Sequence, residues 1–317
     1  MRKQQNFTQP SVTTTYAGEF AGKYIAAALL SARTLDNQYI TIMPNVKFKS
    51  VIQKIQVDSI VNDASCDFTT SGTVALSERI LEPKELQVNL ELCKQEFVDS
   101  WEALQLGYSA FDEIPKDFND YLISYVGGKV AQATEESIWR GTAATNGQFG
   151  GIYNALSSSV VAGGANAPVT ASISGSITSA NVLSALDSLV NAIPNTVYGK
   201  EDVMIYVPTN VVKAYQQALA GGAQGANGWN NTMNVGEKPL NFNGIEMAYC
   251  PGLASSAMVA AQKSNLYFGT GLLSDHNEVR VLDMANLDGS QNYRIIMRYT
   301  AGTQYGIGTD IAIYKNY

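Results

Sequence analysis

The segment Pro115–Gly151 constrains the fold of this chain more than any other, because its apolar residues recur at steps of three and four. That spacing places them on one stripe of a long helix. The stripe comprises Phe118, Tyr121, Leu122, Tyr125, Val126, Val130 and Ala133. Pro115 suits the start of a helix, and Arg140 followed by Gly141 suits its last turn and stop. We therefore expect a helix over Asp117–Arg140, about 35 Å long at about 1.5 Å per residue.

Two consecutive glycines, Gly127 and Gly128, lie in the middle of this helix. Each costs about 0.8 to 1 kcal/mol relative to alanine inside a helix. The pair predicts either a hinge, since helices bend at small residues, or the close approach of another element. The polar side of the helix, which includes Glu135 and Glu136, is expected to face solvent.

Composition excludes several classes of protein. The formal net charge of -7 and the pI of about 4.8 argue against a protein that grips phosphates, which needs clustered Lys and Arg. No apolar run is long enough to cross a bilayer or to serve as a secretion signal, which indicates a cytosolic product. Cys66, Cys93 and Cys250 lie far apart without CxxC spacing, so reduced thiols are expected in place of disulfides or zinc.

Two period-2 segments flank a long polar stretch. Val51, Ile55 and Val57 alternate with polar neighbours, and so do Leu86, Val88, Leu90 and Leu92. Between them, Asp58–Glu85 is polar and rich in turn residues. This pattern predicts an extended hairpin that is apolar on one face and needs a surface to lie on. We expect Leu86, Val88, Leu90 and Leu92 to contact a neighbouring chain.

The remaining segments predict a mixture of helices and strands. Helices are expected at Ala17–Ala32, Glu96–Leu106, Ser179–Ile193 and Asn210–Leu219. Strands are expected at Asp202–Val207, Phe242–Tyr249, Met258–Ala261 and Leu266–Phe268. The Ser-, Ala- and Gly-rich stretch from residue 152 to Ser179 reads as a connector with weak strands. Near the C-terminus, alternation at Tyr293–Tyr299 and Ile311–Ile313 predicts a two-strand sheet piece. The fold class is therefore α+β.

The sequence carries no recognisable catalytic site. His276 is the single histidine, and its neighbours Asp275 and Glu278 are too close in sequence to converge on a metal ion. The glycine-rich segment Gly221–Gly228 follows a helix and lacks the GK[ST] ending of a phosphate loop. No catalytic residue, cofactor or metal is expected. Trp229, next to that segment, is a candidate contact residue.

The order of these features resembles the major capsid proteins of tailed bacteriophages, which have the Hong Kong 97 fold. EESIWRGTAATNGQFGGI is similar to the family's acidic helix end and its glycine-containing turn into a strand, and DVMIYVPTNVVKAYQQAL is similar to its axial strand and helix. The resemblance implies four regions. They are an N-terminal arm (1–45), an extended hairpin loop (46–93), a peripheral domain (94–171 and 262–317) with spine helix 117–140, and an axial domain (172–261).

The function that the resemblance implies is that of a shell subunit, not an enzyme. Pentamers and hexamers would close into an icosahedral capsid around double-stranded DNA, bound without sequence specificity and with no membrane contact. Assembly in the host cytoplasm, capsid maturation, and portal, scaffolding and decoration proteins as partners are implied as well. The virion is the expected location.

Two departures from the family's pattern modify this expectation. No long charged helical segment precedes the arm, so a scaffolding region is expected to be cleaved off or supplied by a separate protein. No residues match the family's covalent cross-link, and nothing marks Lys84 for it, so non-covalent assembly is expected. Two alternatives stay open, namely an encapsulin-type nanocompartment shell, told apart by its cargo, and an α/β enzyme dependent on His276.

Overall fold

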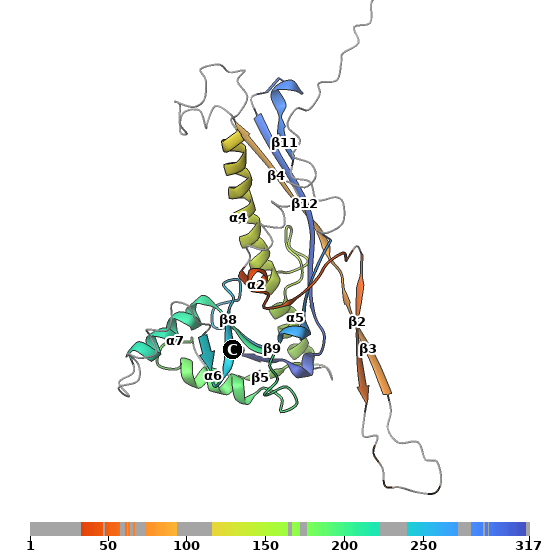
Figure 1. Ribbon diagram of the computed structural model, residues 1–317, viewed down its shortest axis with the longest axis vertical. Coiled ribbons are helices and arrows are strands. Elements are labelled where there is room, and N and C mark those ends of the chain that lie inside the picture. The colour runs from red at the N-terminus through yellow and green to blue at the C-terminus, as the bar shows by residue number, and fades with distance from the viewer. Residues whose placement is uncertain are drawn as a thin grey trace, which may run out of the picture. The chain divides into compact units, whose positions relative to one another are not determined.

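The computed structural model describes residues 33–46, 48–57, 61, 63, 66, 74–93, 116–163, 167–171, 176–221, 240–271, 280–287, 289–290 and 292–314 (Figure 1). The chain divides into two compact units. The first takes its described residues from 85–131 and 272–300, and the second from 32–84, 132–271 and 301–317. The expected helices at 17–32 and 96–106, together with Trp229 and His276, lie outside the described residues.

A six-stranded mixed sheet forms the largest layer of the second unit. Its order is β5 (Val169–Ala171), β13 (Ala312–Tyr314), β9 (Met258–Gln262), β6 (Val203–Val207), β8 (Ile245–Tyr249) and β7 (Leu240–Phe242). Helices α6 (Val182–Asn191) and α7 (Thr209–Gly221) share one hydrophobic core with it. The α6 residues in this core are Val182, Ala185, Leu186, Leu189 and Val190, at helical spacing. The predicted strand-helix alternation is confirmed here.

A second sheet region of this unit is built on β10 (Leu266–Thr270). It pairs in parallel with β1 (Thr41–Met43) and antiparallel with the second half of β12 (Asn292–Tyr305). One face contacts the segment that includes α5 (Ile152–Ala162). There the rings of Phe149 and Phe268 lie 6.2 Å apart, and the Tyr305 hydroxyl lies 2.8 Å from Ser159 Oγ.

Strands β2 (Ser50–Val57) and β3 (Val74–Leu81) form a separate two-stranded antiparallel sheet, called the ribbon below. The prediction of an extended hairpin is thus right for its first strand and wrong for its second. The expected partner, β4 (Lys84–Cys93), pairs with β12. Pro83 separates β3 from β4, and a residue without a backbone N–H interrupts a strand ladder, so the two halves join different sheets.

The described part of the first unit contains the other half of β12 with β4 and β11 (Arg280–Asp283). β11 pairs antiparallel with β12, from Arg280 opposite Ile296 to Asp283 opposite Tyr293. Exposed polar groups link β4 and β12 as well. Arg294 Nε lies 2.9 Å from Glu91 Oε2, and Asn292 Nδ2 lies 2.6 Å from Glu91 Oε1.

The long helix α4 extends over Lys116–Arg140, one residue longer than predicted. Of the predicted stripe, Val126 and Val130 are buried, whereas Ala133 is exposed. The expectation that Glu135 faces solvent is wrong, because its side chain is buried. The polar partners that permit this burial come from segments distant in sequence.

Two further expectations are wrong. The connector after Gly151 begins with helix α5, although Ser and Val form helices poorly. The full burial of Ile152 and Leu156 accounts for that helix, since tertiary packing supplies most helical stability in proteins. The C-terminal strand β13 does not pair with β12 and lies inside the six-stranded sheet. The division into arm, extended loop, peripheral and axial regions stays a prediction.

Candidate assembly surfaces

The ribbon carries an exposed apolar face. Val51 lies opposite Ile80 and Ile55 opposite Leu76, and because side chains alternate along a strand all four project from the same side. The exposed fractions of these side chains are 50% for Val51, 45% for Ile80, 67% for Ile55 and 72% for Leu76. We call these four residues the apolar ribbon face. Two paired strands have no core of their own, so such a face gains stability only when another surface covers it.

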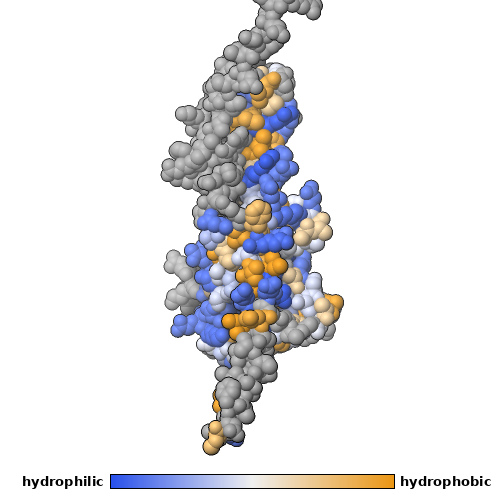
Figure 2. All heavy atoms as spheres, turned by 90° about the vertical axis from the view of Figure 1, so that its right-hand side faces the viewer, coloured by the Kyte–Doolittle hydropathy of each residue, from blue (hydrophilic) through white to orange (hydrophobic). Residues whose placement is uncertain are grey.

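The space-filling view shows one face of the molecule, on which orange apolar side chains are interspersed with blue hydrophilic ones (Figure 2). Between the two apolar pairs of the ribbon, Gln53 lies opposite Glu78. Interfaces between separately folded chains are on the whole no more apolar than the rest of the surface, so this polar pair is compatible with a contact here. Full burial of one such side chain is worth about 1.5 to 3 kcal/mol.

The strand predicted to make this contact is less exposed than the ribbon. Leu86 on β4 is only 6% exposed, Val88 and Leu92 are half-buried, and Leu90 is 39% exposed. Leu86 therefore has little surface left for a neighbour. Whether the other three contact a second chain stays a prediction. The signal that could have located the ribbon was the apolar residues of VALSERIL, which the polar stretch before it obscured.

The glycine pair of α4 lies in unbroken helix. Gly127 is half-buried and Gly128 is exposed, and a Cβ built on Gly128 would meet nothing within 4 Å. Packing among the described residues therefore does not require a glycine at this position. A hinge at this pair, or a close approach by another chain, stays a prediction.

The buried carboxylate of Glu135 joins α4 to α2 (Arg33–Asp36). Thr34 donates to it twice, from its backbone nitrogen at 2.9 Å and from its hydroxyl at 2.5 Å. The indole nitrogen of Trp139 in turn donates to the Thr34 hydroxyl at 3.0 Å. Burial raises the pKa of Glu135, although the hydrogen bonds from Thr34 and the Gly252 backbone oppose that rise. This network fixes the first described residues of the chain to the long helix.

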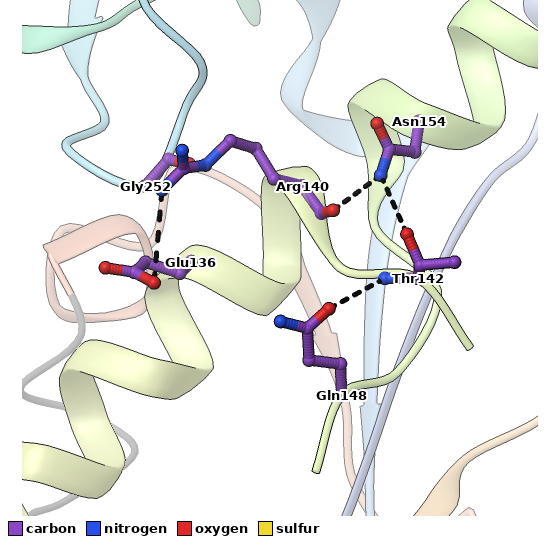
Figure 3. Close-up of polar contacts among 6 residues, drawn as sticks. All are labelled: Glu136, Arg140, Thr142, Gln148, Asn154 and Gly252. Carbon is purple, nitrogen blue, oxygen red and sulfur yellow. Dashed lines mark hydrogen bonds and ion pairs between the residues drawn. The ribbon is translucent and has the colours of Figure 1, made fainter. Parts of the chain in front are cut away.

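Polar contacts also close the C-terminal end of α4 (Figure 3). Arg140 Nε donates to the Gly252 carbonyl at 2.9 Å, and its terminal nitrogen lies 3.9 Å from Glu136 Oε2. Asn154 Nδ2 donates to the carbonyls of Arg140 and Gly141, the latter at 3.2 Å. The last carbonyls of a helix have no partner within the helix, so these contacts stabilise its end.

Lys84 reaches the loop that follows α4. Its ammonium lies 3.1 Å from the carbonyl oxygen of Ala143, 3.3 Å from that of Thr145 and 2.9 Å from that of Gln148. Three acceptors match the three donors of an ammonium. The sequence did not single out this role, because the carbonyls belong to a segment distant from Lys84 in the chain.

Within the described residues, no group of three or more His, Cys, Asp or Glu side chains is placed to hold a metal ion. No helix in the same part of the chain has both the length and the apolarity to span a bilayer. The polar contacts described above stabilise the fold. The feature that is free to contact another molecule is the apolar ribbon face.

The fold is similar to that of proteins in solved phage-like shells. The chain matches the capsid of the native GTA particle with a TM-score of 0.60 and 16% identity, over 90% of this chain and 96% of that one. For the capsid of the empty GTA particle the TM-score is 0.58 with 12% identity, over 98% and 95%. For the capsid of Myoviridae phage XM1 it is 0.54 with 12% identity, over 99% and 97%. No family model and no curated protein matches the sequence.

Proposed function

We propose that this chain is the major capsid protein of a tailed bacteriophage, a subunit that self-assembles into an icosahedral shell. The observation that carries the proposal is the similarity of nearly the whole chain to capsid chains, with 90% or more of both chains covered in each comparison reported above. A match over the full length supports a common architecture, not one shared domain. The role is structural, and the location is the capsid of the virion.

The details of assembly belong to the same proposal. Pentamers and hexamers of this chain would enclose double-stranded DNA without sequence-specific contacts, with assembly in the host cytoplasm and with portal, scaffolding and decoration proteins as partners. The net charge of -7 supports this, because a strongly basic wall would hold packaged DNA too tightly for release. The contacts of Lys84 with three carbonyls of its own chain support non-covalent assembly.

The apolar ribbon face is the contact that this function needs most. We propose that it lies on an adjacent subunit of the same capsomer. Replacing Ile55 and Leu76 by Asp would bury two charges without partners in that contact, so the double variant should stay folded and fail to form shells. Negative-stain electron microscopy and size-exclusion chromatography measure shell formation, and circular dichroism measures folding.

Two further variants make this experiment specific. Ile55→Val with Leu76→Ile keeps the face apolar and should assemble normally. Val88→Asp with Leu90→Asp tests the contact predicted from sequence on β4. Shells of normal yield from Ile55→Asp with Leu76→Asp would contradict the ribbon contact. The absence of any particle from the unaltered protein, produced together with its scaffolding partner, would contradict the proposed function.

A further inference from the structure

The base of the ribbon rests on a part of the sheet without side chains. Gly269 on β10 and Gly302 on β12 are direct cross-strand partners, so the sheet is bare at two adjacent positions. Neither glycine has a positive φ, so the backbone conformation at these two positions does not require glycine. Glycine weakens a strand and often marks a close approach by another segment. We call this pair the glycine socket.

The residues that end the ribbon occupy the socket. A Cβ on Gly269 would lie 2.7 Å from Leu81 Cδ2, and Leu81 is fully buried. A Cβ on Gly302 would lie 2.9 Å from both the carbonyl oxygen of Glu82 and the Cα of Pro83. The first clash is with the end of a buried side chain, which must shift to admit a methyl group, and the second is with backbone. The segment Leu81–Pro83 therefore keeps this position only because both residues beneath it are glycine.

Further contacts hold the same end of the ribbon. Gln304 Nε2 donates to the Ile80 carbonyl at 2.9 Å. The Arg79 guanidinium carbon lies 3.9 Å from the centre of the Tyr305 ring, within the range of a cation–π contact. These residues of β12 lie within three positions of Gly302. One end of the ribbon is thus held from several sides, whereas Ile55 and Leu76, farther along it, are exposed.

We propose that the glycine socket is the joint that sets the direction of the ribbon and so aims the apolar ribbon face at its partner surface. Eight residues at about 3.3 Å each make each strand of the ribbon about 26 Å long. A tilt of about 5° at its base would move the far end by about 2 Å, enough to spoil side-chain complementarity. The importance of this joint for assembly rests on the proposed function, but its control of ribbon direction does not.

The test measures ribbon direction in the full chain, separately from assembly. Spin labels are attached at Glu78→Cys on the ribbon and Asp187→Cys on α6, both exposed, after Cys66→Ser and Cys93→Ser; Cys250 is buried. Electron spin resonance then gives the distance between the labels in unassembled subunits. Gly302→Ala and Gly269→Ala should shift this distance by about 1 Å or more, since Glu78 lies about 10 Å from the base of the ribbon. Leu81→Ala, which empties the socket, should widen its distribution.

The matched control is Gly150→Ala, where a Cβ meets nothing within 4 Å, and it should leave the distance unchanged. If Gly302→Ala does not fold, Gly269→Ala and Leu81→Ala carry the test, because they alter side-chain contacts only. An unchanged, narrow distance in the folded variants would overturn the inference. A shifted distance with normal shell yield would support the joint and contradict the assembly role of the ribbon.

Discussion

Glu135 is the residue whose place in the structure differs most from its expected one. An acidic side chain on a helix is ordinarily a solvated one. Here the residue is 4% exposed, and two donors from Thr34 compensate part of the cost of removing its carboxylate from water. Because burial is the larger effect, the pKa of Glu135 is raised above the ordinary value of 4.5. The charged form is therefore less stable in the folded chain than in the unfolded one.

This residue predicts a dependence of stability on pH. The folded chain binds the proton of Glu135 more tightly, so the contribution of this group is fully present below pH 4.5 and is lost as pH rises through the raised folded pKa. Each tenfold difference in proton affinity corresponds to about 1.4 kcal/mol. Relative to the unaltered protein, Glu135→Gln should become more stable as pH rises through that window, as urea unfolding at a series of pH values would measure.

Glu136→Gln is the matched control, because the neighbouring carboxylate is half exposed. This variant should not show the gain in stability that Glu135→Gln shows, because burial of the carboxylate is the cause of that gain. Parallel curves for Glu135→Gln and the unaltered protein would contradict the account of the buried carboxylate.

At the scale of elements, helix α4 combines a clear helical periodicity with two central glycines that have a low helix propensity. The helix is continuous through Gly127 and Gly128, and Gly128 is exposed among the described residues. Alanine is favoured over glycine in a helix by about 0.8 to 1 kcal/mol. A glycine that the isolated chain does not need is consistent with a requirement of the assembled state, either a bend or a close neighbour.

Gly128→Ala separates these two possibilities. The variant should raise the stability of the unassembled subunit by about 1 kcal/mol, measured by denaturant unfolding. If a neighbouring chain packs against Gly128, the added methyl should block shell formation. If the helix bends there between shell states, shells should form but fail to expand, which electron microscopy of precursor and expanded particles would detect. Normal assembly and normal expansion would contradict both hypotheses.

At the scale of the whole molecule, the acidic balance argues against a protein that retains nucleic acid. With 21 basic and 28 acidic residues, the chain has no excess of positive charge for that purpose. The apolar ribbon face indicates a contact with another surface, which under the proposed function is another copy of this chain.

Particles isolated from the producing cells should therefore contain nuclease-resistant double-stranded DNA, released when the shell is opened. The ratio of absorbance at the nucleic-acid and protein maxima, before and after nuclease treatment, measures it. Particles that hold a folded enzyme and no DNA would contradict the phage capsid and favour the nanocompartment shell.

The sequence by itself determined the elements whose own pattern is strong. The 3.6-residue period predicted α4 to within one residue, and the period in SANVLSALDSLVNAI predicted α6. The apolar run DVMIYV, followed by Pro208, predicted β6. For α6 and β6 the local pattern also predicted which residues are covered, because this information resides in neighbouring residues. For α4 it predicted the extent of the helix but misplaced Ala133 and Glu135.

Only the tertiary structure decided which elements meet. Alternation in Leu86–Leu92 is compatible with pairing to β2 or to β12, since both partnerships bury the same residues of one strand. The burial of Glu135 needed Thr34, and the fit of the segment Leu81–Pro83 needed Gly269 and Gly302. These contacts join residues about a hundred or more positions apart. The local sequence around each residue is compatible with many different partners, so it does not predict which one the residue contacts.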